Sequence, residues 1–188
     1  MNLLFKNTLI IRPRGWGKSL MLSMVKYFFD ASDPPRATEL FASSLLAKND
    51  PDFVAAHCGK WPVVFVSFGK FTAPTWEEMK LLLIRQISLA FRAHRSLLDA
   101  DGGLFADERR RFEAILNEDP SALYQGALED LTALLSRKYQ KGVIVLVDEY
   151  DKPMSSAHEH GYLDKAVQFL SSVFNGCLKG NPYAILSV

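Results

Sequence analysis

The segment that most restricts the fold of this chain is the sequence GWGKS at residues 15–19, which joins two apolar stretches. The apolar run at residues 9–11 predicts a short buried strand, and the spacing of the apolar residues that follow the loop predicts a helix over 18–29. GKS forms the last half of a phosphate-binding loop, in which N–H groups of a tight turn and of a helix N-terminus converge on an anion. The segment therefore predicts a strand–loop–helix unit that binds phosphate.

Each residue of this loop offers a particular contact to a nucleotide. Lys18 is expected to place its charge at the β- and γ-phosphates, and the Ser19 hydroxyl to ligate Mg²⁺. The other residues expected to line the nucleotide are Arg14, Gly15, Trp16, Gly17 and Leu20. The match is partial, because Arg12 stands where the first glycine of such loops usually lies. Taken alone, GKS is also compatible with a glycine turn followed by a lysine on a helix.

A second motif supports the first. Five apolar, mostly β-branched residues at 143–147 precede Asp148 and Glu149. A short apolar run without polar alternation is typical of a central parallel strand, and ligands of open α/β sheets bind at the carboxyl ends of such strands. Asp148 is expected to hold Mg²⁺, and Glu149 to polarise the attacking water. The alternative for Asp148 and Glu149 is the solvated start of a loop.

The length of the chain fits one domain, and the alternation of predicted strands and helices indicates an α/β fold with a mainly parallel sheet. With 22 Lys+Arg and 21 Asp+Glu among 188 residues, the net charge gives no sign of nucleic-acid or membrane binding. No signal-peptide pattern occurs, and two distant cysteines, Cys58 and Cys177, lack metal-site spacing. We therefore expect a reducing, cytoplasmic location.

Local patterns predict the remaining elements. Strands are expected at 62–68 and 184–188, and a loop or helical turn at 49–59. Further helices are expected at residues 38–46, 75–98, 107–117, 119–139 and 162–178. The helix at 75–98 begins with a capping box formed by Thr75 and Glu78. The long stretch at about 76–140 is expected to be an α-helical insertion between two strands.

Three sequence segments resemble those of the predicted AAA-ATPase family, which is often fused to a PD-(D/E)XK nuclease domain. These segments are RPRGWGKS at 12–19, PVVFVSF at 62–68 and VDEYDKP at 147–153, and the resemblance runs from about residue 9 to 183. The family's loop normally lacks the first glycine, so Arg12 fits it. The resemblance implies a three-layer P-loop NTPase fold of the ASCE/AAA-like type and the use of ATP with Mg²⁺.

The chain departs from the family pattern in two places. Gly15 and Trp16 replace the usual Arg-Phe pair of the loop. The family continues past a strand that ends in Thr-Gly into a lid and a nuclease region, whereas residues 184–188 supply part of that strand, with Ser187 at a sensor position. We therefore expect residues 1–188 to be a single, C-terminally incomplete AAA-ATPase-like domain. Its expected partners are further copies of the chain or a nuclease-type region.

Three classes of function fit these motifs. The first is a Mg²⁺-dependent ATPase in which Lys18 and Glu149 are the catalytic residues. The second is a nucleotide-binding interaction or switch module with little or no hydrolysis, and the third, less favoured, is a P-loop kinase. A GTPase fits less well, because no guanine-reading Asn/Thr-Lys-x-Asp motif occurs. His158-Glu159-His160 and the three arginines at 109–111 are expected to be solvent-exposed rather than parts of a site.

Overall fold

The centre of the molecule is a three-stranded parallel sheet in the order β1-β2-β3. A computed structural model describes residues 8–11, 13, 15–69, 71–99, 103–178 and 180–188. The strands are β1 (Val63–Ser67), β2 (Val143–Asp148) and β3 (Ala184–Ser187). The predicted strands at 62–68, 143–147 and 184–188 are thus confirmed. Because the strands are parallel, their carboxyl ends lie at one edge of the sheet, where ligands of such folds bind.

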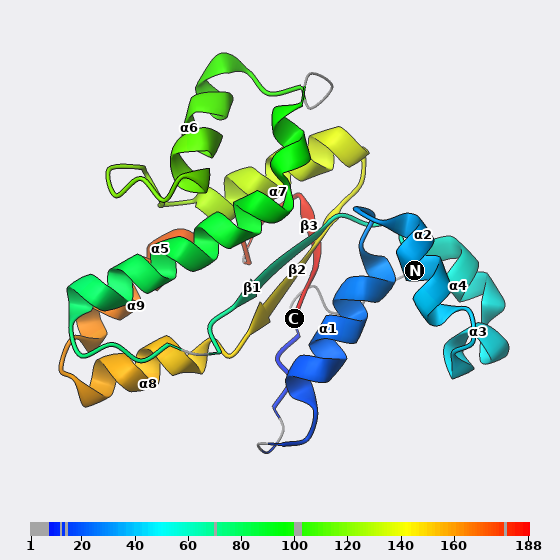
Figure 1. The fold of residues 1–188 in the computed structure, drawn as a ribbon, viewed down its shortest axis with the longest axis horizontal. Helices are drawn as coiled ribbons and strands as arrows, with labels where there is room; N and C mark the ends of the chain where they lie inside the picture. The colour runs from blue at the N-terminus through cyan, green and yellow to red at the C-terminus, as the bar shows by residue number, and fades with distance from the viewer. Residues whose placement is uncertain (1–7, 12, 14, 70, 100–102, 179) are drawn as a thin grey trace.

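Helices cover both faces of the sheet (Figure 1). One side carries α1 (Lys18–Phe29), α2 (Pro34–Phe41), α3 (Leu45–Asn49) and α4 (Pro51–His57). The other side carries α5 (Trp76–Ala93), the 3₁₀-helix η1 (Arg95–Leu98), α6 (Ala106–Leu116), α7 (Ala127–Tyr139), α8 (Asp151–Glu159) and α9 (Leu163–Phe174). The architecture is the α/β arrangement that the sequence predicts.

Strand β2 shows why the sheet needs both layers. Successive side chains of a strand point to opposite faces. Ile144 and Leu146 pack against Leu22 of α1, whereas Val143 and Val145 belong to the larger core formed with α5, α7 and α9. The side chains of residues 143–146 are buried whichever face they point to, which explains the absence of polar alternation in this segment.

The predicted strand at residues 9–11 is not formed. Thr8 donates its N–H to the carbonyl of Ser187 at 2.8 Å, so the segment runs beside β3. Residues 8–11 have no strand assignment, and Leu9 and Ile11 are exposed by 62% and 83%. A buried strand needs a ladder of backbone bonds and packing on both faces. Among the described residues this segment has one such bond to β3, and its apolar side chains border a large cavity instead of packing between two helix layers.

Helix boundaries agree with the sequence where capping residues act as predicted. Helix α1 spans the 18–29 segment, although Leu22 and Phe28 form its buried side while Leu20 and Met24 are exposed. Thr75 accepts a hydrogen bond from the Glu78 N–H and begins α5. That helix ends at Ala93, where η1 takes over, instead of continuing to residue 98.

Three of the expected helices have other bounds in the structure. The helix expected from residue 119 begins only at Ala127, because the Asp119 carboxylate accepts hydrogen bonds from the N–H and hydroxyl of Ser121 and thereby closes a turn. The helix expected at 38–46 is instead α2, which begins at Pro34 because Asp33 accepts from the Arg36 N–H. The helix expected at 162–178 is shorter at both ends, as α9.

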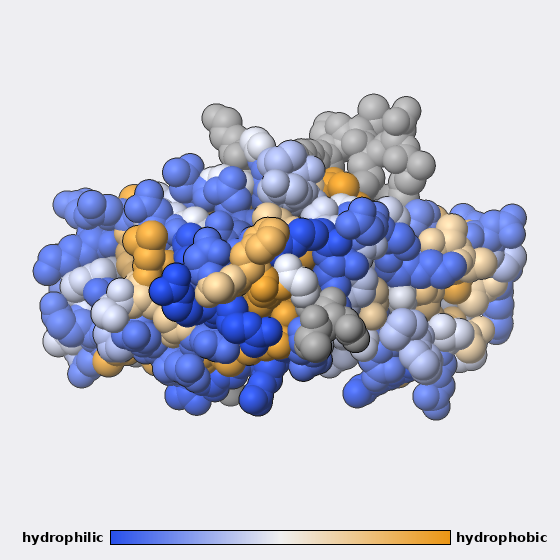
Figure 2. Space-filling model, turned by 90° about the horizontal axis from the view of Figure 1, so that it is seen from above, coloured by the Kyte–Doolittle hydropathy of each residue, from blue (hydrophilic) through white to orange (hydrophobic). Residues whose placement is uncertain are grey.

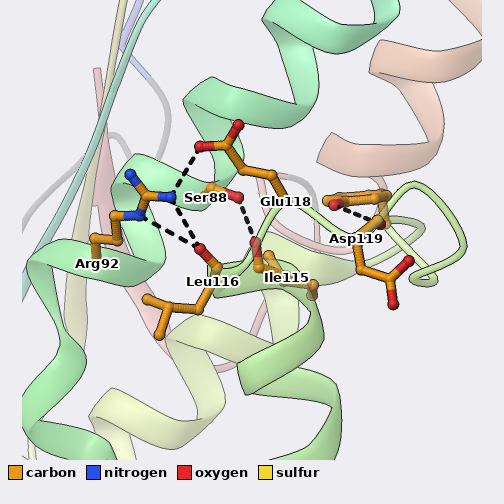
Figure 3. A network of polar contacts seen from close by, with 7 residues as sticks. Ser88, Arg92, Ile115, Leu116, Glu118 and Asp119 are labelled. Atoms are coloured by element: carbon orange, nitrogen blue, oxygen red, sulfur yellow. Dashed lines mark hydrogen bonds and ion pairs between the residues drawn. The ribbon is translucent and has the colours of Figure 1, made fainter.

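Polar contacts join α6 to the long helix α5 (Figure 3). The buried hydroxyl of Ser88 on α5 donates to the carbonyl of Ile115, which lies in the last turn of α6. Arg92 donates to the carbonyl of Leu116 at 3.3 Å and forms an ion pair with Glu118 at 2.9 Å. Carbonyl groups at a helix C-terminus lack intrahelical partners, so these donors fix where α6 ends.

The exterior seen from above is mainly hydrophilic, with small separate apolar areas (Figure 2). Among the helices of the described residues, none combines the length and the apolar character needed to cross a membrane.

Stability should fall in weak acid because His94 is buried. Its Nε2 lies 3.1 Å from the carbonyl oxygen of Val63, and burial lowers the pKa of the imidazole; nearby Asp30 opposes this shift, and Lys26 and Lys138 add to it. Below about pH 6.5 the imidazole becomes protonated in the unfolded chain while it stays neutral in the folded chain. The free energy of unfolding therefore decreases as pH falls through this range.

The measurement is urea unfolding at several pH values between 7.5 and 5.5, compared with His94→Gln. Glutamine keeps a donor for the Val63 carbonyl and does not titrate. The wild type should lose up to about 1.4 kcal/mol more per pH unit than the variant in this window. Parallel pH profiles of the two proteins would contradict this explanation.

Candidate active site

A cavity of about 1220 Å³ brings the two sequence motifs together. Its wall contains residues 15–19 from the loop before α1 and residues 148–152 from the end of β2 and the start of α8. Figure 1 shows this loop at the same end of the molecule as the carboxyl end of β2. The parallel sheet thus places the loop and both acids around one space, although more than 120 residues separate them in the chain.

The loop has the backbone shape of an anion-binding turn. Gly15 and Gly17 adopt left-handed conformations, with φ of 79° and 72°. Gly17 is the N-cap of α1, and no side chain accepts a hydrogen bond at this cap. The first turn contains no acidic residue, so the positive end of the helix dipole meets the cavity without a carboxylate of its own.

Side chains of the loop are placed differently with respect to solvent. Lys18 is half-buried and Ser19 is exposed, and both line the cavity. Trp16 and Leu20 also line it and are 68% and 66% exposed. Arg14, which the sequence also assigns to this site, lies outside the described residues. The structure thus brings the remaining predicted loop residues to the same wall.

Asp148 and Glu149 reach the cavity in different ways. Asp148 is the last residue of β2, and its carbonyl accepts the Phe68 N–H at 3.0 Å, which extends the ladder by one bond. Glu149 follows with a φ of 54°, a left-handed conformation that is uncommon for a residue other than glycine. The chain therefore turns out of the sheet at Glu149, and both residues line the cavity.

Lys152 belongs to the VDEYDKP segment, whose recurrence in the family suggests a role in shaping the site, and in the structure it contacts Glu149. The side-chain ammonium nitrogen of Lys152 lies 3.6 Å from Glu149 Oε2. The backbone N–H of Lys152 donates to the backbone carbonyl of Glu149 at 3.1 Å. Both side chains are one-third exposed, so the pair is partly screened by solvent. Lys152 lies in the first turn of α8 (Asp151–Glu159), a helix that the sequence patterns did not predict, with Pro153 beside it in the same turn. Proline is tolerated in a first helical turn, which was the available signal.

The far wall of the cavity is mainly apolar. It is formed by Met154 of α8, Leu170 and Phe174 of α9, and Leu178. Ser187, the residue at the expected sensor position, is buried and also lines the cavity. A cavity with one polar, charged wall and one apolar wall suits a ligand that carries both phosphate groups and a ring system.

The minor sequence features lie away from the cavity. His158, Glu159 and His160 are exposed at the end of α8, and the described residues contain no group of three potential ligands that could hold a metal ion. Arg109 and Arg111 on α6 are not simply solvated, because they donate to the carbonyls of Leu98 and Gln125, both at 2.7 Å.

Comparison with known proteins gives one match. The model of a family described as Predicted AAA-ATPase matches residues 3–187. No curated protein and no solved structure matches the chain. The family assignment therefore rests on sequence, and the site geometry is described from this structure alone.

Proposed function

The chain belongs to the predicted AAA-ATPase family, and from this premise we propose that it binds ATP with Mg²⁺ and hydrolyses it slowly. The observation that carries the proposal is the cavity that the glycine loop, Lys18, Asp148 and Glu149 share. An anion-binding helix start and a pair of carboxylates at one strand end are the two parts that ATP hydrolysis needs.

The loop wall is suited to the phosphates. The N–H groups of the first turn of α1 are not capped by a side chain, and the two left-handed glycines shape the turn in front of them. At neither glycine would a Cβ meet another atom of the described residues within 4 Å, so none of these residues fills the space before the loop. Lys18 adds a full positive charge at this wall.

The donors for a divalent cation are hard oxygens, which fits Mg²⁺. Ser19 and Asp148 are the residues that would hold it, and both line the cavity. When bound there, Mg²⁺ would neutralise negative charge on the phosphate oxygens.

Glu149 is proposed as the general base. A water molecule attacks the γ-phosphorus, the bond from that phosphorus to the β–γ bridging oxygen breaks, and Glu149 accepts the proton of the water. The products are ADP and inorganic phosphate. Lys152 restrains the Glu149 carboxylate, and the lysine would balance its charge before proton transfer.

Slow turnover is the expected result for this chain. Among the described residues that line the cavity, the cations are Lys18 and Lys152, and none of the segments after the loop brings an arginine to the wall as an arginine finger would. An arginine finger contributes on the order of 10³–10⁵ in rate where it acts. We expect Mg·ATP binding with turnover below about 1 s⁻¹, measured by phosphate release from residues 1–188. Several turnovers per second would show that the cavity already holds a complete catalytic set.

A switch module that binds ATP with little hydrolysis is the second candidate. The Glu149–Lys152 ion pair favours it, because the lysine already occupies the carboxylate oxygen that would have to face the attacking water. A P-loop kinase is less favoured, since two acids at the strand end suit water as the nucleophile. Single-turnover hydrolysis separates the candidates, because a pure switch would retain unhydrolysed ATP.

Two further parts of the proposal concern the surroundings of the protein. Cys58 and Cys177 are free and buried, which supports a reducing compartment such as the cytoplasm, and burial raises the pKa of Cys177 to about 12. Leu9 and Ile11 are largely exposed at the margin of the ATP cavity, which supports closure of that margin by another copy or by a nuclease-type region.

A further inference from the structure

A second cavity, of about 480 Å³, lies at the free edge of β1, away from the proposed ATP site. Its walls come from α1, the turn after α1, α2, β1 and α5, and we call it the edge groove. Strand β1 pairs only with β2 among the described strands. The edge groove therefore runs along backbone groups that the sheet leaves without a neighbouring strand.

The register of the sheet shows which backbone groups face the edge groove. The Ile144 N–H donates to the carbonyl of Pro62, and the Phe68 N–H donates to that of Asp148. In a parallel ladder this pattern directs Val64 and Val66 toward β2 and their odd-numbered neighbours outward.

The contacts of the outward residues agree with this pattern. The outward carbonyl of Val63 is occupied by His94 Nε2. No described group bonds to the N–H or C=O of Phe65 or Ser67, both of which line the groove. Two consecutive outward residues thus present donors and acceptors to the edge groove, as a strand edge does to an incoming strand.

Two cations face the same space. Lys26 lies over the rings of Phe65 and Tyr27, at 5.1 and 5.5 Å from their centroids. The guanidinium carbon of Arg36 also lies over the Tyr27 ring, 5.7 Å from its centroid. Neither cation forms an ion pair with a carboxylate of the described residues.

The two acids of the wall are already engaged in local turns. Asp30 accepts the Ser32 N–H at 2.9 Å, and Asp33 accepts the Arg36 N–H at 3.2 Å as the cap of α2. These bonds hold both carboxylates at the backbone of the turn. Both acids keep their negative charge, but they are held at this turn, whereas Lys26 reaches over the ring of Phe65 in β1 itself. An acidic group that pairs along β1 therefore meets Lys26, and Arg36 beyond it, in preference to the two carboxylates.

From these observations we propose that the edge groove binds an extended, acidic peptide segment of a partner protein as an added strand along β1. Strand and sheet spacings give roughly 160 Å³ for each strand residue, so the groove holds about three residues. This length matches the stretch of β1 from Phe65 to Ser67, which lies beyond the contact between His94 and Val63. Main-chain bonds to Phe65 and Ser67 would supply affinity, and Lys26 and Arg36 would select acidic side chains.

The test uses the labelled peptide TVEVEVT and the complete 188-residue chain. We expect saturable binding by fluorescence polarisation with a Kd below about 1 mM. The lysine peptide TVKVKVT, and the glutamate peptide methylated on alternate backbone nitrogens, should each bind at least tenfold more weakly. Hydrogen exchange should slow at the Phe65 and Ser67 amides and stay unchanged at Val64 and Val66, which already belong to the ladder.

Variants give the matched control. Lys26→Glu and Arg36→Glu should each weaken the glutamate peptide at least tenfold, and the milder Lys26→Gln and Arg36→Gln should do so in part. Lys48→Glu makes the same charge change on exposed α3 and should leave binding unaltered. Failure of the glutamate peptide to bind at several millimolar would overturn the proposal. Equal binding of the methylated peptide would also do so, because it would show an anion site without strand addition.

Discussion

Replacing Glu149 by glutamine should separate ATP binding from hydrolysis. Glutamine keeps the size of the side chain and can still hydrogen-bond to water, but it cannot accept the proton of the attacking water. General-base catalysis contributes about 10²–10⁴ in rate, so phosphate release should fall at least 100-fold. Affinity for Mg·ATP should stay within about threefold, because no proposed contact to ATP or Mg²⁺ involves Glu149. Both quantities are measured on the same preparation, by phosphate release and by titration with fluorescent ATP.

The control for this variant is Glu159→Gln at the other end of α8. It removes the same charge at an exposed position that does not line the cavity. The loss of the Lys152 ion pair in Glu149→Gln should cost at most about 1 kcal/mol of stability, since both partners are partly exposed. Wild-type turnover in Glu149→Gln would show that another group is the base.

Replacing Lys18 by alanine should weaken ATP binding itself. Lys18 is half-buried at the first position of α1, where the loop wall of the cavity begins. Its ammonium is the charge assigned to the β- and γ-phosphates, and we expect at least a tenfold loss of Mg·ATP affinity, about 1.4 kcal/mol. Alanine is a strong helix former, so the fold should be retained.

A second lysine gives the matched comparison for Lys18→Ala. Lys165 lies on α9, is exposed and does not line the cavity, so Lys165→Ala should bind ATP as the wild type does. Unfolding curves of both variants check that the folded state is intact. Equal ATP affinity of Lys18→Ala and the wild type would remove the basis for assigning the loop to phosphate binding.

The parts of the fold that sequence predicted correctly are those in which one local pattern decides the structure. The five apolar residues before Asp148 have no polar alternation, and β2 is buried on both faces as expected. Loop glycines followed by a helical apolar pattern gave α1 its correct bounds. Both signals depend on neighbouring residues only, so they can be read without knowledge of the rest of the chain.

The parts that sequence predicted wrongly depend on distant partners or on competing local bonds. Residues 9–11 look like a strand, but pairing with β3 amounts to one bond from Thr8. Asp119 looks like a helix cap, but its carboxylate binds Ser121 within a turn. At the site, the position of Lys152 beside Glu149 follows from the left-handed turn at Glu149, which no residue type in the segment signals.

Trp16 offers the most direct test of whether ATP binds where the two motifs meet. It is the one of the three tryptophans that lines the cavity; Trp61 packs near His57, and Trp76 packs near Tyr162 and Phe169. Titration with Mg·ATP can be followed through the indole N–H signals in ¹H–¹⁵N NMR spectra, with Trp16→Phe to assign the peak. We predict a saturable shift of the Trp16 signal with one site per chain, and little change at Trp61 and Trp76. ATP binding that leaves the Trp16 signal in place, or the absence of any shift at millimolar Mg·ATP, would contradict the proposed site.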